Sequence, residues 1–138
     1  MAGRQPVPGL RYDLTATLDD RVRALCAAPA RQGELAHPIH AYLGGLAAMP
    51  QPIGDFSRAL GLAFDAGPVL GECRLSFPGR LRVGQAYDAT VEVLDLTRKP
   101  SRRFGRADHL ALAITLSDPS GPASLLHFKM ITPVVDDG

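Results

Sequence analysis

Alternating apolar and polar positions predict a series of β-strands in the second half of the chain. Residues 87–96 place Ala89, Val91 and Val93 on one side of an extended segment. Residues 109–116 alternate in the same way, and their apolar positions are Leu110, Leu112, Ile114 and Leu116. A period of two is typical of strands with one buried face. Further strands are expected at residues 12–17, 69–77 and 125–133, and turns that contain proline or glycine separate the later strands.

Helices are expected between the first strand and this series. Residues 21–28 form a short helix that Asp19 or Asp20 can cap. Residues 42–49 form a helical stretch of small residues. The expected central helix is residues 54–64, where apolar side chains recur every four residues. One strand, then helices, then four antiparallel strands indicate an α+β fold, in which a curved antiparallel β-sheet wraps around the central helix.

Length and composition are those of an ordinary globular domain. The chain has 138 residues, of which 46% are hydrophobic and 21% charged, and its net charge is +1. We expect a single domain over residues 10–133, preceded by a flexible segment 1–9 and followed by a tail 134–138. The small net charge gives no field that would attract nucleic acid or a membrane surface. The sequence contains no run of about 18 apolar residues, so no spanning helix is expected.

Two cysteines, Cys26 and Cys73, lie in apolar surroundings. Buried thiols are expected here rather than a disulfide, which fits a cytoplasmic protein. Neither cysteine has the spacing of metal ligands, so we expect no metal site.

The densest cluster of reactive side chains consists of Glu34, His37, His40 and Tyr42. Histidine has the side-chain pKa closest to neutrality, so two imidazoles beside a carboxylate are where proton-transfer chemistry would be sought. The alternative for His40 is a loop histidine that is hydrogen bonded to the backbone.

The order of elements and four short segments resemble the hotdog fold and, within it, the MaoC-like hydratase and dehydratase family. Residues 33–40 stand where the family shows Gly-Asp-x-Asn-Pro-x-His, and residues 52–56 stand roughly where it shows Ile-Ala-His-Gly-Met. Residues 77–85 resemble the segment that leads into the next long strand, and residues 98–105 resemble the hairpin after it. At the position of the family's acid this chain has Leu35, with Glu34 one residue earlier.

The resemblance implies a hydratase or dehydratase that acts on 3-hydroxyacyl or enoyl thioesters without a cofactor. His40 is then the general base that takes the α-proton, and Glu34 assists loss of the β-hydroxyl as water. Backbone N–H groups near Gly54 stabilise the charge that develops on the thioester carbonyl. His37 either substitutes for His40 or orients it.

Substrate contacts are expected from one aromatic side chain and from a basic hairpin. Tyr42 is a candidate hydrogen-bond donor to the ligand, with a half-buried structural role as the alternative. Arg98, Arg102 and Arg103 suit the phosphates of coenzyme A or of an acyl carrier protein. A solvated hairpin is the alternative for these arginines.

Other functions stay open on the same residues. Asp55 stands where hotdog thioesterases carry an acid that acts as nucleophile or activates water. The chain is otherwise a non-catalytic hotdog subunit of a heteromeric dehydratase, or a scaffold recruited for another reaction in secondary metabolism. Because a single hotdog domain leaves a sheet edge exposed, we expect a homodimer or a hotdog heterodimer.

Overall fold

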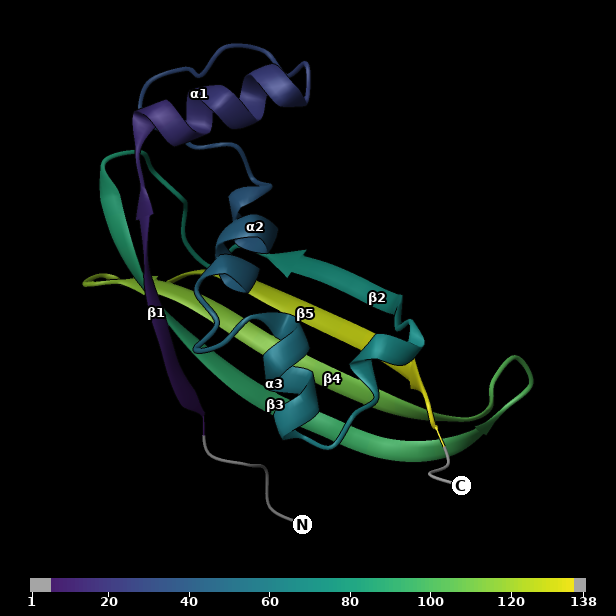
Figure 1. Ribbon diagram of the computed structural model, residues 1–138. Coiled ribbons are helices and arrows are strands. Elements are labelled where there is room, and N and C mark those ends of the chain that lie inside the picture. Colours follow the sequence, from purple (N-terminus) through teal and green to yellow (C-terminus); the bar gives the residue numbers. More distant parts are fainter. Residues whose placement is uncertain (1–5, 136–138) are drawn as a thin grey trace.

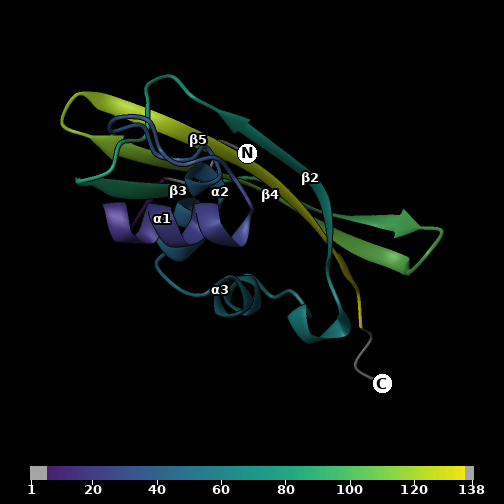
Figure 2. The same cartoon turned by 90° about the horizontal axis from the view of Figure 1, so that it is seen from above.

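A curved, five-stranded antiparallel sheet forms the body of the protein, and helices lie on one side of it (Figures 1 and 2). The computed structural model describes residues 6–135. The strands are β1 (Val7–Leu14), β2 (Val69–Ser76), β3 (Gln85–Ser101), β4 (Gly105–Asp118) and β5 (Gly121–Pro133). Their order across the sheet is β1-β3-β4-β5-β2, so β1 and β2 are the two edge strands. The expected α+β arrangement is confirmed.

The helix packed across the middle of the sheet is α2 (His40–Ala47), rather than the expected segment 54–64. Small residues allow this close approach: a Cβ built on Gly45 would lie 3.1 Å from Leu126 and 3.6 Å from Ile114. The expected central helix is instead the short α3 (Ile53–Ala59), followed by a 3₁₀ turn, η1 (Phe64–Ala66). The four-residue spacing of aromatic and leucine residues therefore did not mark the centre of the fold.

The hydrophobic core lies between the helices and the sheet. It consists of two clusters of buried residues. The members of the larger cluster come from β3, β4, β5, α3 and the segments around α3, and they are Met49, Phe56, Leu62, Val91, Leu110, Leu112, Ile114, Leu126, Phe128 and Met130. The alternating positions of β4 and β5 thus face the helices, as their period of two predicts.

Several boundaries differ from the expected ones. β1 begins at Val7 and so includes residues that we expected to precede the domain. The first helix, α1 (Ala16–Leu25), is capped by Thr15, whose Oγ1 accepts a hydrogen bond from the Leu18 N–H at 3.1 Å. Residues 1–5 and 136–138, which hold the rest of the two expected terminal segments, lie outside the described residues.

Both cysteine side chains are free and exposed, so the expectation of buried thiols is wrong. Within residues 6–135, no helix is long and apolar enough to cross a membrane.

Candidate active site

His40 opens helix α2 and is completely buried, with an exposed fraction of 0%. Both of its ring nitrogens have partners. Nε2 lies 3.0 Å from Oδ1 of Asp19, and Nδ1 lies 2.8 Å from the hydroxyl oxygen of Tyr12. A tyrosine from β1, a histidine from α2 and an aspartate from α1 therefore form one chain of hydrogen bonds, in which the histidine and the aspartate are buried and the tyrosine is partly exposed.

Asp19 is also completely buried, at 0% exposure, and its carboxylate is surrounded by donors. Oδ1 accepts the backbone N–H of His37 at 2.8 Å, and Oδ2 accepts Nε of Arg23 at 2.8 Å and Nη1 of Arg31 at 3.1 Å. Burial alone would raise the pKa of Asp19, but these hydrogen bonds and the one from His40 outweigh it and hold the pKa well below its usual range. The carboxylate is thus ionised near neutral pH.

The ionised carboxylate fixes the tautomer of His40. A carboxylate can only accept hydrogen bonds, so Nε2 of His40 carries the proton that is donated to Asp19. Nδ1 is then the unprotonated nitrogen, and it accepts the O–H of Tyr12. Burial lowers the pKa of His40, against the opposing effect of Asp19, and burial raises the pKa of Tyr12. The resting site therefore holds a neutral tyrosine, a neutral imidazole and an ionised aspartate.

Glu34 does not take the place of Asp19. Its side chain is 76% exposed, and its carboxylate lies 3.9 Å from the guanidinium of Arg82, in the segment between β2 and β3. No hydrogen bond joins it to His40 within the described part of the chain. The expected pairing of Glu34 with His40 is absent from this arrangement because the loop directs Glu34 outward.

His37 contacts the site through its backbone. Its N–H donates to Asp19, while its ring Nδ1 accepts the N–H of Ile39 at 3.0 Å, two residues along the loop. The ring is thus used to shape the turn before α2. Within residues 6–135, the imidazole of His37 makes no hydrogen bond to His40.

Gly54 and Asp55 lie on α3, not at the start of the central helix. Asp55 is 61% exposed and pairs with Arg58 at 3.1 Å, so its carboxylate belongs to a surface ion pair. A Cβ on Gly54 would lie 3.1 Å from the ring of Phe64, so the glycine lets that ring pack closely. The structure does not bring either residue into a hydrogen bond with His40.

Within residues 6–135, none of the other expected substrate-binding residues is hydrogen bonded to Tyr12, His40 or Asp19. Tyr42 is partly buried and packs against the hydrophobic core. The β3–β4 hairpin, which carries Arg102 and Arg103, projects from the end of the sheet opposite to α1 (Figures 1 and 2). Arg98 makes two hydrogen bonds to Asp108, at 2.8 and 3.1 Å.

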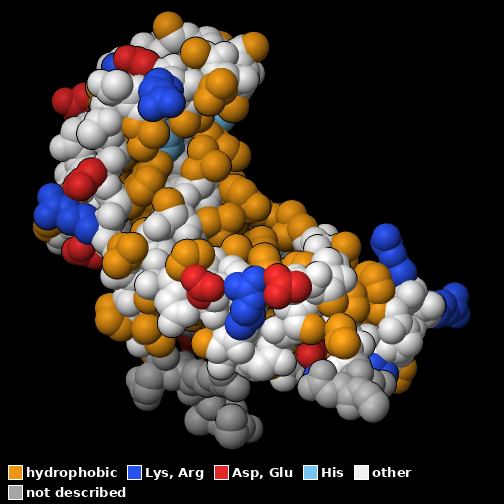
Figure 3. Space-filling view, viewed as in Figure 1, with side chains coloured by type: hydrophobic (Ala, Val, Ile, Leu, Met, Phe, Trp, Pro, Cys, Tyr) orange, Lys and Arg blue, Asp and Glu red, His pale blue; other side chains and the backbone are white. Residues whose placement is uncertain are grey.

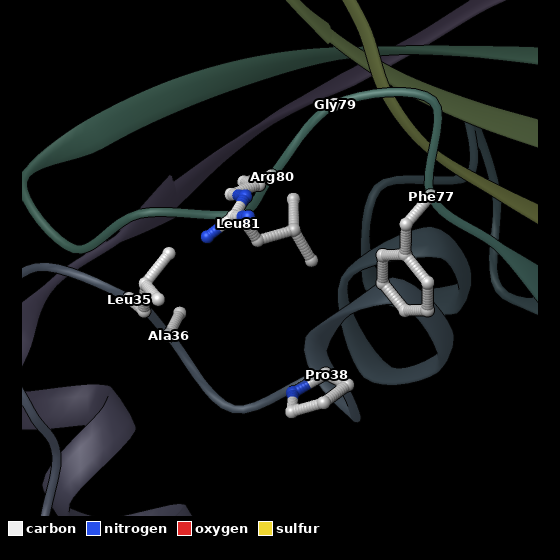
Figure 4. Close-up of a pocket in the computed structure, with 7 residues that line it drawn as sticks. All are labelled: Leu35, Ala36, Pro38, Phe77, Gly79, Arg80 and Leu81. Atoms are coloured by element: carbon white, nitrogen blue, oxygen red, sulfur yellow. The ribbon is translucent and has the colours of Figure 1, made fainter.

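An apolar pocket of about 400 Å³ adjoins the loop that leads into α2 (Figure 4). It is lined by Leu35, Ala36, Pro38, Phe77, Gly79, Arg80 and Leu81. Figure 3 shows hydrophobic side chains gathered in a hollow between the end of the molecule with α1 and the part with α3. Arg80, the one charged residue of the lining, lies beside Leu81. The pocket suits a ligand with an apolar body.

Two residues of the site, Asp19 and Tyr12, were not among the expected site residues. Asp19 was expected only as a possible helix cap, and Tyr12 only as part of a strand. The one local signal is the spacing of Asp19 and Arg23, which lie four residues apart and pair along α1.

No protein-family model and no curated protein matches the sequence. Solved structures do share the fold. The ChsH1–ChsH2 complex from Mycobacterium tuberculosis is 13% identical, with 99% of this chain and 88% of that chain covered and a TM-score of 0.69. The C-terminally truncated HadBC (3R-hydroxyacyl-ACP dehydratase) complex from the same organism is 12% identical, with 89% and 95% covered and a TM-score of 0.63. A MaoC-like dehydratase from Rhodospirillum rubrum is 15% identical, with 99% and 95% covered and a TM-score of 0.52. At these identities the likeness establishes the hotdog fold.

Proposed function

We propose that the protein is a hydratase or dehydratase of acyl thioesters, with His40 as its acid–base group and Asp19 as the carboxylate partner of His40. The observation that supports this most directly is the buried His40–Asp19 pair at the first residue of the central helix. The same fold occurs in the HadBC dehydratase complex and in a MaoC-like dehydratase, which makes this chemistry the first to test.

The pair has the properties that a general base needs. The imidazole is neutral, with Nδ1 unprotonated, so it can receive a proton. The ionised Asp19 then stabilises the imidazolium that forms, as a carboxylate behind a catalytic histidine does in other acid–base sites. Dehydration removes the α-proton of a 3-hydroxyacyl thioester and releases the β-hydroxyl as water, and hydration reverses these steps.

The apolar pocket beside the loop is the proposed site for the acyl chain. Its walls are mostly apolar, which suits a hydrocarbon chain. Arg80 at this pocket suits an anionic group of the carrier, such as the phosphate of coenzyme A or of a phosphopantetheine arm.

We further propose that the working form is a homodimer or a hotdog heterodimer that pairs along β2. This strand is at the edge of the sheet and presents unpaired backbone groups. Leu70 is 53% exposed on this strand and Phe77 is 43% exposed just after it. Two of the similar structures, ChsH1–ChsH2 and HadBC, are complexes of two different chains.

A second candidate function is a non-catalytic hotdog subunit. One observation favours it: His40 has no exposed surface, and both of its ring nitrogens are hydrogen bonded within the protein. In that case the Tyr12–His40–Asp19 chain stabilises the fold, and a partner chain supplies the reactive groups.

The test is a mass-spectrometric assay of the purified protein with crotonyl-CoA and with 3-hydroxyacyl thioesters. Asp19→Asn and His40→Gln are expected to lower kcat by about 100-fold or more. The matched controls are Asp20→Asn, next in sequence but 64% exposed, and Glu34→Gln, and both should retain activity close to wild type.

The alternatives give different results in the same assay. Release of free thiol that is lost in Asp55→Asn would favour a thioesterase. A wild-type protein that neither adds nor removes water would contradict the proposal and favour the non-catalytic subunit, which would then be tested by activation of a co-expressed hotdog partner.

A further inference from the structure

The buried His40–Asp19 pair has no direct opening to a substrate. Both side chains have 0% exposure, and both nitrogens of the imidazole are occupied. Within residues 6–135, Tyr12 is the hydrogen-bond partner of the unprotonated nitrogen, and unlike the other two side chains it is partly exposed. Of these three side chains, Tyr12 is therefore the one that belongs to a residue with exposed surface.

We infer that Tyr12 is a catalytic residue that carries protons between the bound substrate and His40. This inference rests on the proposed function. The substrate's Cα–H bond breaks and its proton binds the Tyr12 oxygen, while the proton of the Tyr12 hydroxyl moves to Nδ1 of His40. The electron pair stays on the substrate as an enolate, and the imidazolium is paired with Asp19.

The second half of the reaction returns the proton by the same route. His40 gives its Nδ1 proton back to the Tyr12 oxygen as Tyr12 protonates the departing β-hydroxyl. The C–O bond breaks, water leaves, and the electron pair of the enolate forms the double bond. Protons and charges balance, and one group serves as base and then as acid. No second carboxylate is required, which agrees with the outward position of Glu34.

The packing of β1 on α2 holds Tyr12 in the required place. A Cβ built on Gly44 would lie 2.6 Å from Cε2 and 2.7 Å from Cδ2 of the Tyr12 ring, so only glycine lets the ring lie against the helix at this point. The ring centroids of Tyr12 and His40 are 6.1 Å apart, with the planes tilted by 46°. The phenol oxygen is directed at Nδ1 by this packing.

The first test compares Tyr12→Phe with Tyr87→Phe. Each change removes one hydrogen-bonded hydroxyl. The hydroxyl of Tyr87 accepts the backbone N–H of Arg82 at 2.8 Å and donates to the backbone carbonyl of Arg80 at 3.4 Å, and neither of these bonds involves His40. The ¹⁵N resonances of the His40 ring report the contact independently of activity. In Tyr12→Phe the Nδ1 resonance should shift and Nε2 should stay protonated, whereas in Tyr87→Phe both resonances should stay in place.

Kinetics then separate a catalytic role from a structural one. In Tyr12→Phe we expect kcat to fall by about 100-fold with KM within about twofold of wild type. Fluorotyrosine at position 12 keeps the hydroxyl but makes it more acidic, so it should restore the Nδ1 contact with an altered kcat. A purely structural hydroxyl would restore the wild-type kcat.

Each outcome is decisive. An active wild type with an unchanged kcat in Tyr12→Phe would overturn the inference and leave the proposed function standing. A restored wild-type kcat with fluorotyrosine would also overturn it, in favour of a positioning role. A wild type without hydratase or dehydratase turnover would overturn both.

Discussion

Replacement of Asp19 by alanine is the most informative change for stability. It removes a carboxylate that accepts four hydrogen bonds, from His37, His40, Arg23 and Arg31. The imidazole and the backbone N–H then lose their partner inside the protein. The two arginines keep some contact with water, because their side chains are 15% and 18% exposed.

The expected loss of stability can be estimated from these hydrogen bonds. A hydrogen bond to a charged group contributes about 1.5–3 kcal/mol, but the four bonds are not additive, because they share one acceptor. Removal of one partner from a buried ion pair costs about 3–5 kcal/mol, and we expect a decrease in the free energy of unfolding of this size. At about 4 °C per kcal/mol for a chain of this length, Tm should fall by about 12–20 °C.

Differential scanning calorimetry and urea unfolding at pH 7 measure this loss. The matched control is Asp13→Ala. This change breaks an ion pair of similar length, 3.0 Å, between Asp13 and Arg11, but the two side chains are 67% and 68% exposed. That change should cost less than about 1 kcal/mol. If Asp19→Ala were as stable as the control to within 1 kcal/mol, the carboxylate would not hold the site together, and the reasoning from burial and hydrogen bonding would be wrong.

Three further predictions concern pH, packing and assembly. The free energy of unfolding should fall as the pH drops from 7 to 5. Below about pH 6.5 the histidine of the unfolded chain takes up a proton, whereas buried His40, whose pKa is lowered, stays neutral to lower pH. Urea titrations of His40→Gln should show a weaker dependence of stability on pH. Gly44→Ala should lower stability by about 1–3 kcal/mol in calorimetry and shift the His40 ring resonances, because its Cβ would overlap the ring of Tyr12. Leu70→Lys should convert the proposed dimer to monomer in sedimentation velocity, and a wild type that sediments as a monomer would contradict edge pairing along β2.

The strands could be predicted from the sequence because one face of the sheet is buried. The apolar positions of β4 alternate through its centre, and the residues concerned are buried in the structure. The sequence did not predict the part of β3 and β4 nearest their hairpin turn. Consecutive residues there, such as Arg98 and Lys99, are both polar, so apolar and polar positions do not alternate although the two backbones remain paired. The sequence pattern also did not show that α2 is the central helix. Gly44 and Gly45 have low helix propensity, yet their lack of side chains lets α2 pack tightly.

The sequence singled out the histidine of the candidate site, but it did not identify the hydrogen-bond partners of that histidine. His40 stood out because of the neighbouring proline and histidine in a short segment. Asp19 lies 21 residues before it and Tyr12 lies 28 residues before it, on a different helix and a strand. Their meeting depends on how α1 and β1 pack against α2, which is a property of the tertiary fold. Glu34, which is close in sequence, points outward because its loop runs along the surface.

The hydrogen bonds that hold Asp19 also determine the position of the pocket wall. Arg23, which donates to Asp19, donates as well to the backbone carbonyl of Leu35 at 3.2 Å, and Leu35 lines the apolar pocket. The backbone N–H of His37, which lies between two other lining residues in the sequence, donates to the same carboxylate that accepts the hydrogen bond from Nε2 of His40. A change in the charge of Asp19 would therefore weaken its contacts both with the segment that forms the pocket wall and with the imidazole. The proposed acid–base group and the proposed acyl site are two parts of one hydrogen-bonded unit, so we expect a ligand that displaces this loop to alter the environment of His40 as well.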